Sequence, residues 1–438
     1  MMMNVDSGNS KIFEQNRIVV IKDDPIILLI NYICAISSLL LMIVPILQGY
    51  LFGTYYSFFM ILTMGGWLAS SFLLSLNFLK KTNGLFVAIL CIPLLYIFFA
   101  LLGLGNIRNM VINIAVPYYA YIVFFFYYTT KRKTGLAIIA GFVFSGFIIT
   151  TISTLIAVFE NPYITREIEN VTIKIENYKN NIGTVNHVYA ASIIGILIAC
   201  FLQGGAFKKR MTKVLAVIIM IICFWLGITG SSGITLIATI LACIYLLLQK
   251  QKAYVRFFVV LLTGIFLLLV EEWIVLLLVN ISQEIDNKYL AQKIYDIAQT
   301  MVEGDAVGSF SDRVVRWQAD IQVGIDTFFI GAGPIYQGKA IGFWNTVYHV
   351  NDHSQLFGDF ARYGILFTVF IICLFIKFQQ QIKLIAKEEQ INCKFGALWL
   401  MVSIMYISQP IFLNYIIPVL LLFLVPSSLF LIKKLQKN

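Results

Sequence analysis

The sequence predicts an all-α polytopic membrane protein with about 12 transmembrane helices and a large external loop that contains short helices. Three observations lead to this fold class. The chain is 60% hydrophobic and 12% charged, and its mean hydropathy is +0.86, far outside the range of soluble domains. Its apolar residues form repeated runs of about 20 residues, the length that crosses a bilayer as a helix. Its basic residues gather in the connections between these runs.

The apolar runs divide the chain into five parts. The N-terminal tail lacks the short apolar core and cleavage site of a signal peptide, so we expect the first span to be retained. The parts are a cytoplasmic tail (1–25), spans one to nine (26–280), a large extracytoplasmic loop (281–353), spans ten to twelve (354–432) and a cytoplasmic tail (433–438). The spans are expected near 26–47, 55–79, 84–104, 109–130, 135–159, 185–205, 212–229, 232–249, 254–280, 354–376, 395–410 and 412–432.

Basic clusters set the expected orientation. They occupy every second connection and both tails, as the positive-inside rule requires, so both termini are expected in the cytoplasm. The net charge of +10 is thereby assigned to topology, which excludes nucleic acid as a partner. All three histidines then map to the outer side. The clusters lie within 11–22, 80–81, 131–133, 208–213, 250–256, 377–394 and 433–437.

The large external loop is expected to contain two helices. Residues 286–301 carry apolar side chains at helical spacing, which predicts an amphipathic helix on the bilayer surface or on the bundle. A second helix is expected to begin after Ser311, a good N-cap residue, and to run to about Gly324. A turn with two glycines and a proline follows at 331–334. The second helix carries Val314, Trp317 and Ile321 on one face and Arg313, Arg316 and Asp320 on another.

His353 is the candidate general base. It stands between Asp352 and Ser354 at the outer mouth of an expected span, within reach of a lipid-borne head group and of external water. Imidazole is the usual base at neutral pH, and a neighbouring carboxylate can orient its ring. The alternative is a histidine that only forms hydrogen bonds at the membrane interface. His349, one helical turn upstream, is a supporting candidate.

Arg313 and Arg316 are the candidate phosphate ligands. Guanidinium groups bind phosphate through paired hydrogen bonds, and two of them at a spacing of three can hold a pyrophosphate from one side. The alternative is ion pairing within the helix, with Asp312 and Asp320. Basic residues are otherwise kept to the cytoplasmic side, so arginines outside need another use. Further outer arginines that could line an anionic site are Arg108, Arg166 and Arg362.

Three polar residues stand at the outer end of the span that opens after residue 353, namely Asp359, Arg362 and Tyr363. Ionisable residues within a span normally face a cavity or a partner. We therefore count these three as supporting site residues. Pairing of Asp359 with Arg362 at a spacing of three is the structural alternative.

Three segments resemble the bacterial O-antigen polymerase and O-antigen ligase superfamily, the Wzy-type polymerases and their relatives. NIGTVNHVYAASIIG resembles the family's Asn-rich start of a middle helix, and WLGITGSSGITL resembles its Thr-Gly-Ser-Arg-Gly segment. RVVRWQADIQVGIDTFFIGAGP followed by HSQLFGDFARYGI resembles its Arg-x-x-x-Trp, Gly-x-Gly and His-Asn-x-x-Leu patterns, the last of which ends in Tyr-Gly. The chain departs from the family where Ser232 replaces an arginine, Ser354 an asparagine and Thr327 a proline.

This resemblance implies a GT-C-like membrane glycosyltransferase that needs neither metal nor cofactor. Its substrate is an undecaprenyl-pyrophosphate-linked oligosaccharide at the outer face of the cytoplasmic membrane, and its product is capsule, exopolysaccharide or O-antigen. His353 carries over as the base that deprotonates the acceptor sugar, and the arginines as pyrophosphate ligands, with Arg108 or Arg166 in support. The implied partners are membrane lipid and, in the same pathway, a chain-length regulator and a flippase.

Two other functions stay open on the sequence. An O-antigen ligase passes a finished polysaccharide to another acceptor and carries similar motifs. A polysaccharide flippase or transporter also has about 12 spans, and Glu271 and Glu272 within the expected span 254–280 could serve its internal site. That span is either two pieces joined by a break or one whose acids face a cavity. An external insertion of about 70 residues argues against a transporter.

Overall fold

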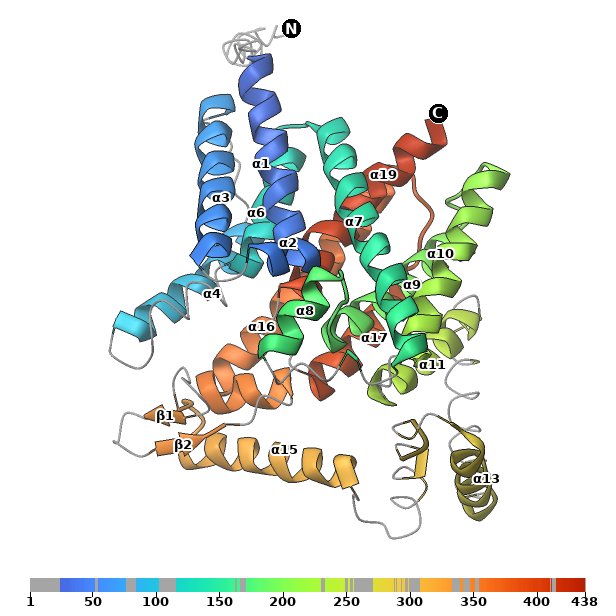
Figure 1. Cartoon of the computed structure of the whole chain (residues 1–438). Helices are drawn as coiled ribbons and strands as arrows, with labels where there is room; N and C mark the ends of the chain where they lie inside the picture. The colour runs from blue at the N-terminus through green and yellow to red at the C-terminus, as the bar shows by residue number, and fades with distance from the viewer. Residues whose placement is uncertain are drawn as a thin grey trace, which may run out of the picture.

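Helices make up nearly all of the chain that the structure describes (Figure 1). The computed structural model describes residues 24–51, 54–75, 84–101, 116–161, 164–165, 171–229, 233–248, 251–252, 255, 271–286, 288, 290–292, 294–295, 298, 308–332, 339–341, 347–350, 354–409, 411 and 415–437. The predicted class of a helical protein is confirmed for these residues.

Seven of the described helices are long and apolar enough to cross a membrane, and two shorter apolar helices accompany them. They are compatible with a multi-pass membrane protein. The expected number of about 12 spans stays a prediction, because 76–83, 102–115 and 256–270 lie outside the described residues. The seven segments are Pro25–Ile43, Tyr55–Leu74, Lys133–Glu160, Val185–Gln203, Arg210–Thr229, Gln355–Glu388 and Ile416–Gln436.

The first helices begin where capping chemistry and proline place them. Asp24 caps α1 (Pro25–Ile43): its carboxylate accepts a hydrogen bond of 2.8 Å from the Ile26 amide. Val44 is extended, and Pro45 then opens α2 (Pro45–Tyr50). The other helices of the body are α3 (Thr54–Leu74), α4 (Gly84–Leu101), α6 (Val116–Thr129), α7 (Lys133–Glu160), α9 (Val185–Gln203), α10 (Arg210–Thr229), α11 (Gly233–Leu248), α16 (Gln355–Glu388) and α17 (Gly396–Ser408).

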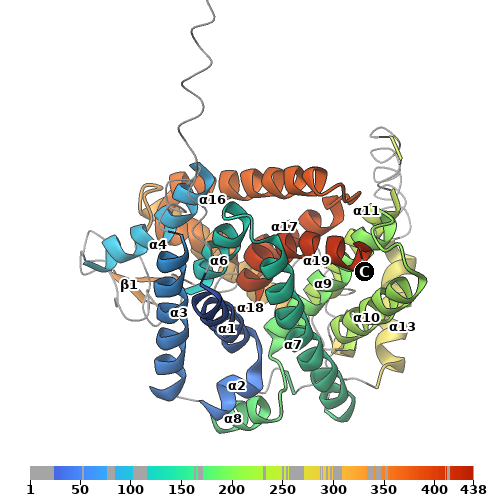
Figure 2. The same ribbon diagram turned by 90° about the horizontal axis from the view of Figure 1, so that it is seen from above.

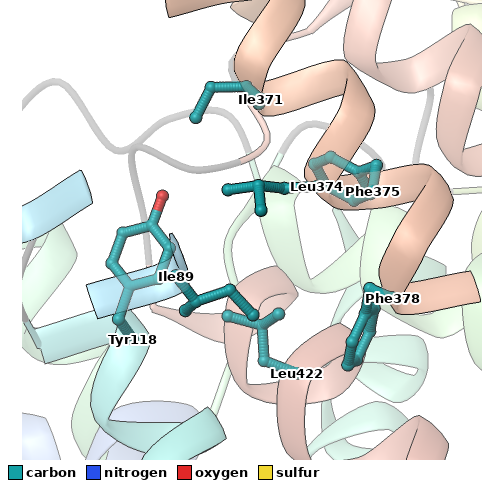
Figure 3. A pocket seen from close by; sticks show the side chains of 7 residues that line it. All are labelled: Ile89, Tyr118, Ile371, Leu374, Phe375, Phe378 and Leu422. Carbon is teal, nitrogen blue, oxygen red and sulfur yellow. The ribbon is translucent and has the colours of Figure 1, made fainter. Parts of the chain in front are cut away.

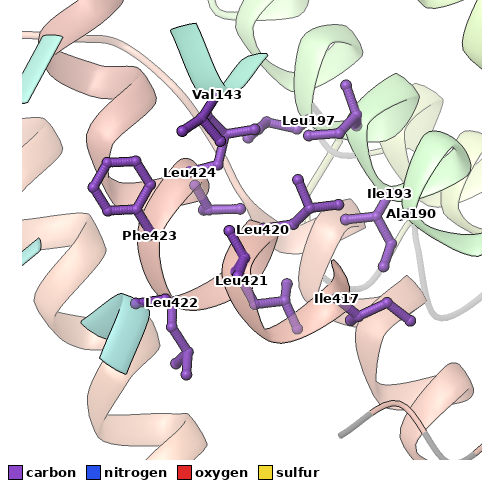
Figure 4. Packing of buried hydrophobic residues seen from close by; sticks show 14 of the residues in the cluster. Val143, Ala190, Ile193, Leu197, Ile417, Leu420, Leu421, Leu422, Phe423 and Leu424 are labelled. Atoms are coloured by element: carbon purple, nitrogen blue, oxygen red, sulfur yellow. The ribbon is translucent and has the colours of Figure 1, made fainter. Parts of the chain in front are cut away.

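The last helical segment of the chain forms the centre of the bundle. It consists of α18 (Ile416–Val419), the π-helical turn η4 (Leu420–Leu424) and α19 (Val425–Lys437). Residues 416–430 are buried, as expected of a helix that is apolar on all sides. Figure 4 shows the leucines of η4 against Val143 of α7 and Ile193 and Leu197 of α9. Seen from above, other helices surround this segment (Figure 2).

Several connections meet at the end of the molecule where α1 begins and α19 ends, which we call the terminal end (Figure 1). The Gln436 amide donates a hydrogen bond of 2.7 Å to the Ala206 carbonyl, and the Lys433 ammonium donates one of 2.7 Å to the Glu389 carbonyl. The Glu389 carboxylate forms an ion pair with Lys133. The connections at 130–133, 204–209 and 389–395 therefore lie together. This agrees with the predicted placement of their basic clusters on one side.

The opposite end, the loop end, carries the elements between the spans (Figure 1). These are α13 (Glu271–Glu284), α15 (Gly308–Asp326), β1 (Lys339–Ile341) and β2 (Val347–His349). A further short helix, α8 (Val171–Lys179), packs on α2. The strands pair antiparallel, with Lys339 opposite His349, so the all-α prediction missed a small sheet. Pairs this short have too few alternating residues to give a sequence signal.

Two expected boundaries are wrong. The helix expected to start after Ser311 is α15, which already begins at Gly308, so Ser311 lies in its first turn. Serine is acceptable in a first turn as well as at a cap, which leaves the start ambiguous on sequence. The expected span 254–280 ends in α13, which continues to Glu284 and lies at the loop end with α15 (Figure 1).

Candidate functional site

The start of α16 is fixed by polar contacts with α17. The Ser354 hydroxyl accepts a hydrogen bond of 3.2 Å from the Phe357 amide, as an N-cap does, and donates one of 2.5 Å to the Ile407 carbonyl. The Gln355 amide donates to the Gln409 carbonyl at 3.1 Å. The residue that follows His353 is therefore anchored on the neighbouring helix. His353 itself lies outside the described residues.

A buried carboxylate lies one turn further along α16. Asp359 is 3% exposed, and its two oxygens accept hydrogen bonds from the Gln355 side-chain amide at 2.8 Å and from the Tyr406 hydroxyl at 2.9 Å. Burial of a carboxylate is costly unless its oxygens are bonded, and these two donors meet that need. Within the described part of the chain, Arg362 is not among its partners. The alternative in which Asp359 pairs with Arg362 is thus wrong.

Arg362 and Tyr363 complete the first segment of α16. Both are buried, at 7% and 8% exposed, and the Tyr363 ring lies 4.8 Å from the ring of Phe367. A buried arginine in a membrane helix requires polar surroundings or a ligand. This position agrees with the expectation that the outer end of the span faces the protein interior.

Gly364 interrupts α16 directly after these residues. Its backbone has φ 77° and ψ 179°, a conformation that L residues with a side chain rarely adopt. A Cβ atom there would lie 2.2 Å from the Phe329 carbonyl oxygen. The glycine of the Tyr-Gly pair is thus required by the backbone and by a close approach of the chain after α15.

The turn after α15 is docked on this kink. Gly331 has φ 95°, and a Cβ atom there would lie 2.5 Å from the Arg362 carbonyl oxygen. The Ala332 amide donates to the Ala361 carbonyl at 2.8 Å, and the Ile365 amide donates to the Phe329 carbonyl at 3.0 Å. The Gly-x-Gly segment and the Tyr-Gly pair, 33 residues apart at Gly331 and Gly364, therefore meet backbone to backbone.

The polar face of α15 is turned toward the protein. The Trp317 ring lies 5.7 Å from the Phe357 ring of α16, and a Cβ atom at Gly324 would clash with the Phe360 ring at 2.2 Å. Asp320 is fully buried and Arg316 is half-buried. The face expected to carry Arg313, Arg316 and Asp320 is therefore not a solvated surface. Arg313 belongs to α15, but its side chain lies outside the described part.

The remaining predicted site residues are less completely placed. His349 ends β2, which contacts α15, and its side chain lies outside the described part. Arg108, Arg166 and Asp352 fall outside the described residues altogether. The structure thus brings Arg316, Asp359, Arg362 and Tyr363 together on one helix pair.

A small apolar groove runs beside α16 (Figure 3). Tyr118 of α6 lines it, and this tyrosine lies within electrostatic range of Asp359 and Tyr363. Tyr118 is thus the residue that the groove has in common with the surroundings of the buried carboxylate. The other lining residues are Ile89, Ile371, Leu374, Phe375, Phe378 and Leu422.

A second polar cluster holds the loop ends of α7 and α9. His187 is fully buried. Its Nε2 atom lies 3.1 Å from the Thr151 hydroxyl, and its ring stacks on Phe147 at 4.5 Å. Asn181 accepts from the Thr150 hydroxyl at 3.1 Å and donates to the Ser153 hydroxyl at 3.2 Å. The Asn-rich segment thus has a structural role here, in fixing the chain before α9.

Sequence reasoning missed two residues of the α16 cluster. Gln355 stands four positions before Asp359, the spacing at which side chains on a helix meet, so this signal was available. Tyr406 lies 47 positions away, and nothing in its local sequence marks it as a partner.

Compared with known proteins, the chain matches no protein-family model and no curated sequence.

Proposed function

We propose that this protein is a polysaccharide polymerase that joins undecaprenyl-pyrophosphate-linked repeat units at the outer face of the cytoplasmic membrane. The observation that carries the proposal is the backbone contact between the turn at Gly331 and the helix kink at Tyr363–Gly364. These two segments carry the main resemblance to Wzy-type polymerases. A site that both segments form together would explain why the two motifs occur in one chain. Arg316 and Arg362 lie on the same helix pair, and His353 directly precedes its anchored start.

The proposed reaction is a glycosyl transfer with His353 as general base. The imidazole takes the proton of an acceptor sugar hydroxyl, and that oxygen forms a bond to the anomeric carbon of the donor. The bond between this carbon and the pyrophosphate oxygen breaks, and its electron pair leaves with undecaprenyl pyrophosphate. Arg313 and Arg316 stabilise the charge that develops on the leaving group.

The apolar groove supports a lipid-linked donor. A polyprenyl chain needs an apolar path beside the site, and the groove between α4, α6, α16 and η4 is apolar except for the Tyr118 hydroxyl. Undecaprenyl carriers bring the reacting pyrophosphate to the membrane surface. The groove and the buried polar cluster therefore fit a substrate with one apolar end and one anionic end.

The proposal is tested in a host strain whose copy of this gene is deleted. Wild-type protein is expected to restore a ladder of surface polysaccharide on a gel, whereas His353→Ala gives single repeat units at equal membrane levels. Removal of a general base lowers a rate by about 100-fold or more. Lys288→Ala, at an exposed lysine of the loop end, is the matched control and keeps the ladder. A full ladder from His353→Ala refutes the assigned base.

The same strain separates the polymerase from a transporter. A transporter predicts that deletion leaves repeat units on the inner leaflet, and that Glu271→Gln with Glu272→Gln removes function while His353→Ala does not. The polymerase predicts the reverse, with repeat units that reach the outer leaflet and remain unjoined.

A further inference from the structure

A second apolar groove, of about 150 Å³, opens between α7, α9, α10 and α19 in the terminal half of the molecule. It lies at the other end of the bundle from the α15–α16 site. Its lining is Phe144, Leu197, Ile198, Phe201, Phe207, Thr212, Leu215, Ala216, Ile219, Leu424, Ser428, Leu431, Ile432 and Leu435.

The wall of this groove offers no free polar group among its described residues. Its two hydroxyls are used inside their own helices or turns: Thr212 donates to the Lys209 carbonyl at 2.8 Å, and Ser428 donates to the Val425 carbonyl at 2.6 Å. A ligand in the groove is therefore held by apolar contact alone. This excludes a sugar or a peptide backbone as the occupant.

The shape of the groove suits a linear chain. The residues contributed by the last helix, from Leu424 to Leu435, form one stripe that is roughly 16 Å long at 1.5 Å per residue. The stripe runs from the centre of the bundle to the terminal end. A hydrocarbon chain that enters from the membrane surface matches this geometry.

The opening of the groove is basic. Lys208, Lys209, Arg210 and Lys213 are exposed, and they flank the lining residues Phe207 and Thr212. No acid occurs between residues 204 and 229. Within the described part of the chain, none of these four cations takes part in an ion pair. Lipid phosphates lie at this level of a membrane, next to the apolar region that the groove faces.

We infer that this groove binds one anionic phospholipid, with an acyl chain along α19 and its phosphate on the basic residues 208–213. The apolar wall supplies affinity for any lipid chain, and the unopposed charges supply the preference for an anionic head group. The site ties the connection at 204–209 to the end of the chain, where Gln436 already bonds to Ala206.

The test is a competition for the purified full-length protein. It is incubated in detergent with equal amounts of phosphatidylglycerol and phosphatidylcholine of identical acyl chains, and retained lipid is counted by native mass spectrometry. Wild-type protein is expected to retain phosphatidylglycerol in excess. Lys208→Gln/Lys209→Gln/Arg210→Gln is expected to lower that excess at least about fivefold. Lys377→Gln/Lys383→Gln/Lys387→Gln, which removes as many charges from α16, leaves it unchanged.

The groove itself is tested by Ala216→Phe, which fills it from α10. Ala216 is only 6% exposed, so a phenylalanine there could disturb folding. The variant is therefore compared with the wild type only if both elute alike on gel filtration. The triple variant at residues 208–210 lies on the surface and tests the proposal in either case. Ala216→Phe is expected to lose retained phosphatidylglycerol. Equal retention of the two lipids by wild type, or an unchanged excess in the 208–210 variant, overturns the inference.

Discussion

Asp359 shows how a single charged residue is kept inside an apolar bundle. Its carboxylate is bonded on one side by its own helix, through Gln355, and on the other by α17, through Tyr406. A hydrogen bond to a charged group contributes about 1.5–3 kcal/mol, and a buried polar group without its partner costs about 1–3 kcal/mol. The pair therefore joins two helices at the loop end of the bundle.

Removal of either partner is expected to destabilise the protein. Tyr406→Phe takes away one donor and is expected to lower the free energy of unfolding by about 1.5–3 kcal/mol. Asp359→Ala removes the acceptor of both hydrogen bonds and is expected to cost more. Thermal unfolding in detergent measures both. Tyr295→Phe, at a tyrosine that is 41% exposed, is the control, and a Tyr406→Phe variant as stable as this control contradicts the account.

At the scale of elements, the contact between the turn after α15 and the kink of α16 organises the candidate site. Two glycines with positive φ, Gly331 and Gly364, allow the two backbones to approach, and two amide-to-carbonyl hydrogen bonds hold them. The kink also ends the first segment of α16, so that Asp359 and Arg362 lie on a short helix that is separate in direction from the long one that follows.

Gly364→Ala is expected to break this junction. A positive φ with ψ near 180° is a conformation that is essentially restricted to glycine, and it costs an alanine about 1–3 kcal/mol. The Cβ contact of 2.2 Å with the Phe329 carbonyl adds to that cost. We expect a lower unfolding temperature and a weaker polysaccharide ladder. Gly65→Ala in α3, where nothing lies within 4 Å of the added Cβ, is the matched control and is expected to be neutral or to stabilise by about 0.5–1 kcal/mol. Equal behaviour of the two variants contradicts the assigned role of the kink.

The elements also show what sequence can and cannot predict. The helix that became α15 was predicted from its N-cap candidate Ser311, and the turn at 331–334 from its glycines and proline, because both signals are local. Three features were not predicted: the start of α15 at Gly308, the pairing of β1 with β2, and the hydrogen bond from Tyr406 to Asp359. The start at Gly308 was missed because serine suits a first turn as well as a cap, and the strands were missed because they are too short to alternate visibly. The bond from Tyr406 depends on a contact between distant segments, of which local propensity carries no record. The partial burial of Arg316 likewise follows from the packing of α15 against α16.

For the whole molecule, the sequence predicted best on which side of the helix bundle the basic connections lie. Basic clusters in every second connection placed those connections on one side, and contacts among Ala206, Glu389, Lys133 and Gln436 place three of them together at the terminal end. The elements α13 and α15 lie at the other end (Figure 1). The charge rule works because it depends on composition of each connection and not on tertiary contacts.

The two ends predict which residues face the cell exterior. In a variant whose native cysteines are replaced by serine, Lys288→Cys is expected to react with a membrane-impermeant maleimide in intact spheroplasts. Lys383→Cys, near the terminal end of α16, is expected to react only after the membrane is opened. Both lysines are exposed, so accessibility to the reagent is matched. Labelling of Lys383→Cys from outside contradicts the proposed orientation.

Polymerase activity is measured with purified protein in lipid vesicles, supplied with lipid-linked repeat units extracted from the deletion strain. The account predicts a ladder of polymer together with the release of one undecaprenyl pyrophosphate for each bond formed. It also predicts that His353→Ala slows both at least about 100-fold, while Lys288→Ala leaves them unchanged. Repeat units that stay single in the presence of folded wild-type protein would show that the chain is not a polymerase.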